Sequence, residues 1–211
     1  KGKYYESITM SNQGLIGTGK FEYMTSWGRS ENIMFHPDSM YAVLSEFEIQ
    51  KQLTGIEYPQ VNSADNNIIF YPYQDELVVY TGSKPFTILN DSTFLDGNLI
   101  LTSKGLEGSG RMDLTNSVLV SDNFKYQTYA FNSDTADFRL KSLNTDGFTL
   151  VTDNVNAHVD FESRSGLFQT NEEFSLVEFP ENKYVSRLDL FVWNMDKTEL
   201  EMGVKSGGEG T

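Results

Sequence analysis

Histidine and cysteine, which supply much of the chemistry of protein sites, are scarce in this chain. It has no cysteine and only two histidines, His36 and His158. Without thiolates there is no cysteine nucleophile and no cysteine-based zinc or iron–sulfur site. His158 and Asp160 are two residues apart on a segment of alternating polarity, so their side chains point the same way and do not predict a Ser-His-Asp triad. His36 precedes Pro37 and is interpreted as a turn residue. The sequence therefore predicts no catalytic residue, no metal site and no cofactor.

Carboxylates are the other reactive groups present in number, with 30 Asp and Glu against 16 Lys and Arg. A glycosidase pair is defined by its separation in space, and no acidic segment has the spacing of an EF-hand loop. We interpret acidic segments such as residues 132–137 as solvated turns. Polysaccharide hydrolase or lyase activity stays open as a third hypothesis. The net charge of −14 repels a phosphate backbone, so nucleic acid is not expected as a partner.

Aromatic side chains are the strongest candidates for ligand contact, since the chain has 15 Phe, 11 Tyr and 2 Trp. Rings in or beside strands can stack on sugar faces or line an apolar channel, although filling of the core is the alternative for each of them. The candidate ligand-binding residues are Trp27, Tyr71, Tyr73, Tyr184 and Trp193.

A glycine-rich motif occurs twice, as GLIGTGKFE at residues 14–22 and as GLEGSGRMD at residues 105–113. A nucleotide-binding loop needs a helix after its glycines. Here each motif runs into a segment that alternates like a strand. We therefore interpret the glycines as turn or bulge positions that let one backbone pack closely on another.

The two motifs belong to an internal duplication with an offset of 91 residues, which continues to Phe47 and Phe138. Further on, Tyr58 matches Phe179 at an offset of 121, so the second copy carries about 30 extra residues between roughly residues 140 and 176. These extra residues read as strands. The predicted domains are a first β repeat at 1–90, a second at 91–202 and a flexible tail at 203–211.

Strand patterns dominate the chain. Residues 151–162 alternate apolar and polar side chains, which is typical of a half-buried strand. Turn formers such as Asp96-Gly97 and Asp146-Gly147 separate many short apolar runs. We therefore expect an all-β fold, an elongated repeat β-sheet stack of jellyroll or solenoid type built from two tandem copies. No run approaches the roughly 18 apolar residues of a membrane helix, so no transmembrane segment is expected.

Several segments carry a resemblance to a known group: SDNFKY at residues 121–126, DTADFRL at 134–140, NVNAHVDF at 154–161, FPENKY at 179–184 and WNMDK at 193–197. With the glycine-rich unit, they resemble large uncharacterised repeat proteins of Gram-negative bacteria. These are distantly similar to the organic-solvent-tolerance and lipopolysaccharide-transport β-jellyroll group. The resemblance implies a β stack in the periplasm or at the cell surface, with a groove for lipid or glycolipid. The chain departs from the pattern in its extra residues and its acidity.

The leading functional hypothesis is a non-enzymatic extracytoplasmic scaffold that holds lipid or glycolipid in an apolar groove and adjoins further repeats of the same protein. The alternative is a carbohydrate-binding or adhesive surface module with polysaccharide as its partner. A continuous apolar inner face with an open seam would favour the scaffold. An exposed row of Trp and Tyr flanked by Asp and Asn would favour the alternative.

Overall fold

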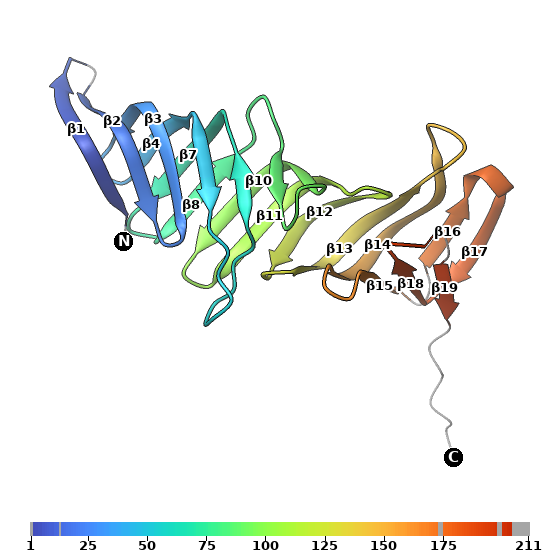
Figure 1. The fold of residues 1–211 in the computed structure, drawn as a ribbon. Coiled ribbons are helices and arrows are strands. Elements are labelled where there is room, and N and C mark those ends of the chain that lie inside the picture. Colours follow the sequence, from blue (N-terminus) through green and yellow to red (C-terminus); the bar gives the residue numbers. More distant parts are fainter. Residues whose placement is uncertain (1, 13, 173–174, 198–199, 204–211) are drawn as a thin grey trace. The chain divides into compact units, whose positions relative to one another are not determined.

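The computed structural model describes residues 2–12, 14–172, 175–197 and 200–203 (Figure 1). These residues form nineteen strands and one 3-10 turn (Pro180–Asn182), so the expected all-β fold is confirmed. The predicted tail, residues 203–211, lies outside the described residues apart from Gly203.

The chain divides into two compact units, which we describe separately. The first comprises Lys1–Met112 and Lys125–Tyr129, and the second comprises Asp113–Phe124 and Ala130–Thr211. These units do not coincide with the predicted copies at 1–90 and 91–202, because a strand that follows residue 90 completes the core of the first unit.

The strands of the first unit are β1 (Lys3–Ser11), β2 (Gly14–Tyr23), β3 (Ser26–Phe35), β4 (Met40–Leu44), β5 (Glu46–Ile49), β6 (Val61–Ser63), β7 (Asn66–Tyr71), β8 (Glu76–Tyr80), β9 (Phe86–Ile88), β10 (Phe94–Thr102) and most of β11 (Gly105–Asp113). The residues of β12 (Ser117–Tyr126) are divided between the two units. The second unit contains β13 (Ala130–Lys141), β14 (Phe148–Asp160), β15 (Ser165–Thr170), β16 (Ser175–Phe179), β17 (Tyr184–Leu188), β18 (Leu190–Asn194) and β19 (Leu200–Gly203).

The first unit contains a closed antiparallel barrel of eight strands. We call a strand a fork when two stretches of it pair with two different strands of diverging layers. β3 is a fork, because residues 33–35 pair with β4 and residues 26–29 pair with β5. One layer continues β4–β7–β8 and the other β5–β6–β9. Both layers end on β10, which pairs with β8 through residues 98–102 and with β9 through residues 94–95. β10 therefore closes the barrel, while β2 and β1 extend the sheet from β3 away from it.

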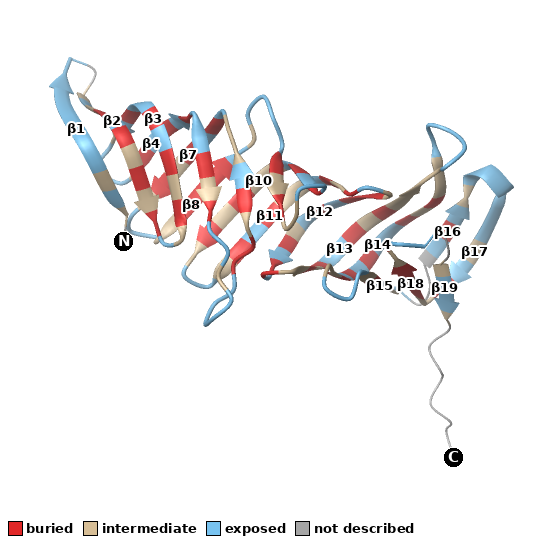
Figure 2. Cartoon of the chain, in the orientation of Figure 1, coloured by how far each residue is buried: buried red, intermediate tan, exposed pale blue. Residues whose placement is uncertain are grey.

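Alternation along the strands places the core inside this barrel (Figure 2). In β4, Met40, Ala42 and Leu44 are buried, whereas Tyr41 and Val43 face outward. Each such strand buries one row of apolar side chains, and the two layers pack those rows against each other.

The second unit is also forked, but its fork is open. Residues 155–160 of β14 pair with β15, and residues 151–152 pair with β16. One layer continues β15–β18–β19 and the other β16–β17. Among the described residues, no strand of this unit pairs with both β19 and β17, as β10 pairs with both β8 and β9.

The strand limits follow the 91-residue offset through three strands: β1, β2 and β3 correspond to β10, β11 and β12. Local details correspond as well, because the backbone N–H of Asn32 donates to Ser30 Oγ at 3.0 Å and that of Asn123 to Ser121 Oγ at 3.0 Å. The correspondence then ends, since the second fork is at β14 and not at β12.

The positions expected to superpose farther along therefore have different roles. Phe47 lies on β5, beyond the first fork, whereas Phe138 lies on β13, before the second. Tyr58 is buried and its hydroxyl donates to the Thr102 carbonyl, whereas Phe179 is half-buried against Tyr184. The extra residues do form strands, mainly β14 and β15, as expected.

The hairpin β1–β2 shares an unusual backbone feature with β10–β11. Glu6 has φ +94° and pairs with Gly19 at φ +144°, while the corresponding residues Gly97 and Gly110 have φ +158° and +127°. Positive φ strains a residue that has a side chain. We expect Glu6→Gly to leave the stability unchanged or to raise it by up to about 1 kcal/mol, because relief of strain offsets added chain entropy and a weak exposed ion pair with Arg29.

The matched control for Glu6→Gly is Glu107→Gly. Glu107 is exposed on β11 and is not among the positive-φ residues, so its replacement brings only the entropy cost of about 0.5 to 1 kcal/mol. Chemical denaturation of the two variants measures the difference. Equal destabilisation by both would mean that Glu6 is unstrained.

Candidate functional site

A small apolar cavity of about 200 Å³ lies in the first unit beside β1. We call it the inner groove, because most of its side chains lie on the face of the sheet that also forms the barrel core. Its lining consists of Gly2, Lys3, Tyr4, Phe21, Phe35, His36, Ser39, Met40, Phe70 and Pro72.

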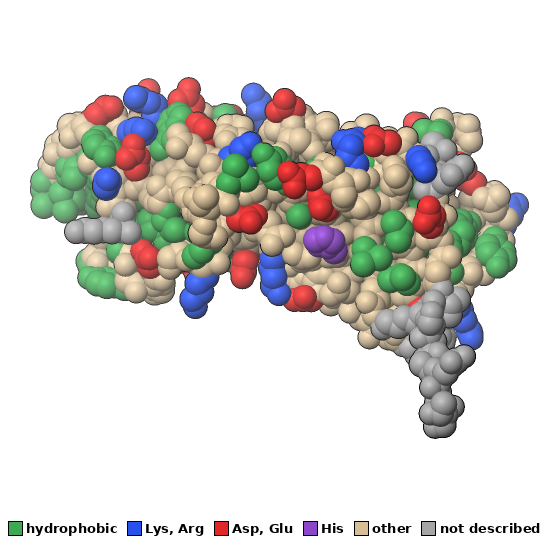
Figure 3. Space-filling view, turned by 60° about the horizontal axis from the view of Figure 1, so that its bottom comes forward, with side chains coloured by type: hydrophobic (Ala, Val, Ile, Leu, Met, Phe, Trp, Pro, Cys, Tyr) green, Lys and Arg blue, Asp and Glu red, His purple; other side chains and the backbone are tan. Residues whose placement is uncertain are grey.

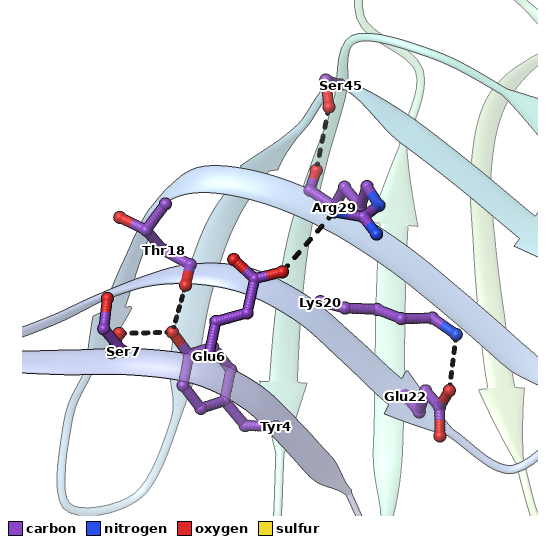
Figure 4. Close-up of polar contacts among 8 residues, drawn as sticks. All are labelled: Tyr4, Glu6, Ser7, Thr18, Lys20, Glu22, Arg29 and Ser45. Carbon is purple, nitrogen blue, oxygen red and sulfur yellow. Dashed lines mark hydrogen bonds and ion pairs between the residues drawn. The ribbon is translucent and has the colours of Figure 1, made fainter.

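Tyr4 is fixed in place at one wall of this groove. Its ring meets Phe35 edge to face, with the centroids 5.3 Å apart. Its hydroxyl lies 2.5 Å from the Ser7 carbonyl oxygen and 2.6 Å from that of Thr18, and can donate to either (Figure 4). Desolvation is the main cause that raises the pKa of Tyr4. Gly17 makes room for this ring, since a Cβ there would lie 2.8 Å from the Tyr4 hydroxyl oxygen.

The other walls are aromatic and join the barrel core. Phe21 and Phe70 lie 5.2 Å apart between ring centroids, and Tyr23 lies 4.9 Å from Phe70. The Tyr23 hydroxyl donates to the Asp75 carbonyl at 2.5 Å, and burial is the main cause that raises its pKa. The hydroxyl groups of Tyr4 and Tyr23 are therefore both hydrogen-bonded to backbone carbonyls.

The apolar surface of the groove continues along β1 and β2 into solvent. Ile8, Met10 and Leu15 have the same parity as Tyr4 and Phe35, by the pairings of β1 with β2 and of β2 with β3. Their exposures are 51%, 73% and 42%. Hydrophobic side chains also gather at the β1–β2 end of the first unit in the space-filling view (Figure 3). An apolar face that is buried elsewhere in the unit is thus uncovered here.

A second cavity, the outer groove, lies on the opposite face of β3, β4, β7 and β8. It measures about 320 Å³ and is lined by Asn32, Met34, Tyr41, Ala42, Val43, Asn67, Ile68, Ile69 and Tyr80. Tyr71 lies next to this set. Desolvation, followed by electrostatic interaction with Tyr41 and Tyr80, raises the pKa of Tyr71.

The residues expected from the sequence to bind a ligand do not form one row. Trp27 is half-buried on β3, where its indole N–H donates to Glu48 at 2.9 Å and the Lys20 ammonium lies 5.1 Å from the ring centroid. Tyr71 ends β7 and Tyr73 follows in the turn with 80% exposure. None of these three lines either groove, although Tyr71 interacts with Tyr41 and Tyr80 of the outer groove.

The two remaining candidates belong to the second unit. Tyr184 is 59% exposed and its ring centroid is 5.9 Å from that of Phe179. Trp193 is 2% exposed and lies 5.6 Å from Phe138 in the core. In this structure Trp193 is a packing residue, because its ring faces are covered by neighbouring side chains.

Sequence reasoning missed Tyr4 and Phe35 in the inner groove and Tyr41 in the outer groove. The sequence shows that these residues are aromatic, but it does not show that they lie close together, because strand pairing determines that. The usable signal was the 91-residue offset, at which Tyr4 corresponds to Leu95, a fully buried residue.

A cavity of about 350 Å³ lies in the second unit, and its lining combines apolar side chains such as Leu176 with Asp153, Asn154, Glu172 and Glu178. Arg139 neutralises part of it through an ion pair with Asp153 at 2.6 Å. Within the described residues, no group of three or more His, Asp or Glu side chains is placed to hold a metal ion.

Comparison with protein-family models, curated proteins and solved structures gives no match. In the described part of the chain, no helix has the length and apolar character needed to cross a membrane.

Proposed function

We propose that this chain is a non-enzymatic extracytoplasmic scaffold, built from two tandem β repeats, that holds an acyl chain of a lipid or glycolipid in the inner groove. The observation that carries the proposal is the uncovered apolar face of β1 and β2, where Ile8, Met10 and Leu15 extend the groove into solvent. Contiguous exposed apolar surface of this kind marks a binding surface.

Burial of hydrocarbon is the driving force that this surface offers. Each methylene group removed from water contributes about 0.8 kcal/mol, so a segment of about six contributes roughly 5 kcal/mol before the cost of association. Lys3 is the one lysine or arginine side chain in the lining of the inner groove. A chain carrying −14 overall would therefore meet an anionic headgroup most favourably at this place.

The two-copy architecture is supported by the matching limits of β1–β3 and β10–β12 and by the positive φ at corresponding hairpin positions. Location in the periplasm or at the cell surface of a Gram-negative bacterium is supported by the sequence resemblance. Further repeats of the same protein are proposed as its neighbours. A scaffold of this kind needs no catalytic residue or cofactor.

Titration of the protein with a fluorescent fatty acid tests the proposal. We expect Phe35→Ser, which puts a small polar side chain in the inner groove, to weaken binding by about tenfold or more, equivalent to about 1.4 kcal/mol. The matched control is Tyr41→Ser on the outer groove, which should bind like the unmodified chain. Binding that is absent, or that is lost in Tyr41→Ser and kept in Phe35→Ser, would reject the inner groove as the site.

A carbohydrate-binding or adhesive module is the second candidate, favoured by the outer groove. Tyr41 and Tyr80 lie there beside the amides of Asn32 and Asn67, the combination of ring face and hydrogen-bonding groups that binds sugars. Affinity electrophoresis in polysaccharide gels should then show retardation that Tyr41→Ser abolishes and Phe35→Ser does not.

A further inference from the structure

We infer that the free edge of β1 is a docking site for a second copy of this chain. β1 of one copy would pair with the β19 and β17 edges of the other, as β10 pairs with β8 and β9 in the first unit. The inference rests on the proposed duplication. The proposed partner of the uncovered apolar face is the open fork in the second unit of another copy.

The first unit shows how such a fork is closed. Its layers end in β8 and β9, and both hydrogen-bond to β10. The second unit has a similar fork, in which β19 ends one layer after three strands and β17 ends the other after two. Its closing strand is absent from the described residues. An open pair of edges of this kind presents unpaired N–H and C=O groups that favour pairing with another strand.

β1 has the features of the closing strand. It corresponds residue for residue to β10, and the hairpin that it forms with β2 has positive φ at the same two positions as β10–β11. β10 pairs with β8 and β9 along one of its edges. The corresponding edge of β1 pairs with no strand among the described residues. Within the described part of the first unit, β1 is an edge strand that pairs with β2 (Figure 1).

The exposures of corresponding side chains on β10 and β1 show that β1 lacks a covering neighbour strand. Leu99 and Leu101 of β10 are both 0% exposed beneath the two layers, whereas their counterparts Ile8 and Met10 are 51% and 73% exposed. The difference arises from the missing neighbour, since the strands themselves alternate in the same way.

The edge of β19 carries complementary apolar residues. Leu200 and Met202 pair with Trp193 and Phe191, which are buried, so the four side chains share the core parity. Leu200 is half-buried and Met202 is 54% exposed. Apolar side chains on the inner face of both free edges allow pairing that extends the core from one copy into the next.

The ladder of the first unit also predicts the register. Phe70 pairs with Leu77, which pairs with Leu101 of β10. Phe191 matches Phe70 at the 121-residue offset and pairs with Met202, so Met202 occupies the place of Leu77. Met10 occupies the place of Leu101. We therefore expect Met202 of one copy to lie opposite Met10 of the next, in an antiparallel ladder.

Such a contact joins two different surfaces, so it repeats head to tail and gives open chains of copies. The charge of −14 on each copy opposes it. Salt reduces the repulsion, because the Debye length falls from about 10 Å at 0.1 M to about 3 Å at 1 M. We expect light scattering to show monomers in dilute buffer and association as the salt concentration rises.

Cysteine cross-linking tests the register, since the chain has no cysteine of its own. A Met10→Cys protein is mixed at high salt with a mass-tagged Met202→Cys protein and oxidised. The mixed disulfide should form at least about tenfold more than with Thr9→Cys in place of Met10→Cys, because Thr9 points to the other face of the sheet and a disulfide needs neighbouring Cβ atoms. Equal yields with both proteins, or none, would overturn the inference.

A lysine substitution on the β19 edge distinguishes this inference from the proposal of lipid binding. Met202→Lys replaces an exposed side chain of the second unit and should abolish salt-induced association, as edge lysines do. It should leave fatty acid binding at the inner groove unchanged. Val43→Lys, at an exposed position outside both edges, is the matched control and should associate normally. A chain that binds fatty acid but stays monomeric at every salt concentration refutes the docking alone, and one that associates without binding fatty acid refutes the lipid proposal alone.

Discussion

Replacing Phe138 with alanine is expected to lower the free energy of unfolding by about 3 to 5 kcal/mol. Phe138 is fully buried, and its ring centroid lies 4.3 Å from that of Phe168, 5.8 Å from Phe191 and 5.6 Å from Trp193. Its removal leaves a cavity among rings that cannot collapse, since they are held on the neighbouring strands β15 and β18. Denaturant titration of the variant measures the loss.

His158→Ala is the control for that experiment. His158 is exposed on β14 and its Nδ1 lies 2.7 Å from Asn132 Oδ1, so its loss should cost less than about 0.5 kcal/mol. Phe161, expected from alternation to lie on the apolar face, is only half-buried in the turn after β14, so Phe161→Ala should cost about 1 kcal/mol. If His158→Ala proved costlier than Phe138→Ala, the assignment of the two faces of this sheet would be inverted.

Gly110→Ala is expected to destabilise the first unit by at least about 3 kcal/mol. A Cβ at this position would lie 2.2 Å from the Asp96 carbonyl oxygen, and φ is +127°. Two costs therefore combine: backbone strain of about 1 to 3 kcal/mol and overlap with the neighbouring strand, which forces the hairpin apart.

Gly105→Ala separates these two costs. Gly105 has φ +147°, but no atom lies within 4 Å of its hypothetical Cβ. Its replacement should therefore cost only the strain, about 1 kcal/mol or slightly more. Thermal or chemical unfolding of both variants gives the comparison. A Gly105→Ala loss as large as that of Gly110→Ala would mean that close approach of β10 and β11 is not what requires Gly110.

The amino-acid sequence determined the fold class and the local elements of this protein. Period-two alternation specified strands such as β14 because a strand places successive side chains on opposite faces. The 91-residue offset identified the corresponding hairpins β1–β2 and β10–β11. The glycine pattern is visible in the sequence because Gly19 and Gly110 both have positive φ, which favours glycine. The absence of cysteine likewise excluded cysteine nucleophiles and cysteine-based metal sites.

The tertiary structure alone decided which strands fork, which edges close and which rings reach solvent. Pairing of β3 with β5 and of β4 with β7 joins residues well separated in sequence, such as Ser26 with Ile49 and Met40 with Phe70. Alternation is the same whether a strand lies before or after a fork. For this reason Trp193 and Tyr73 looked alike as aromatic candidates, yet one is 2% exposed and the other 80%. Likewise, nothing in β1 itself separates it from β10. A side chain at a given parity is buried only when a neighbouring strand covers it, and that neighbour is supplied by the fold.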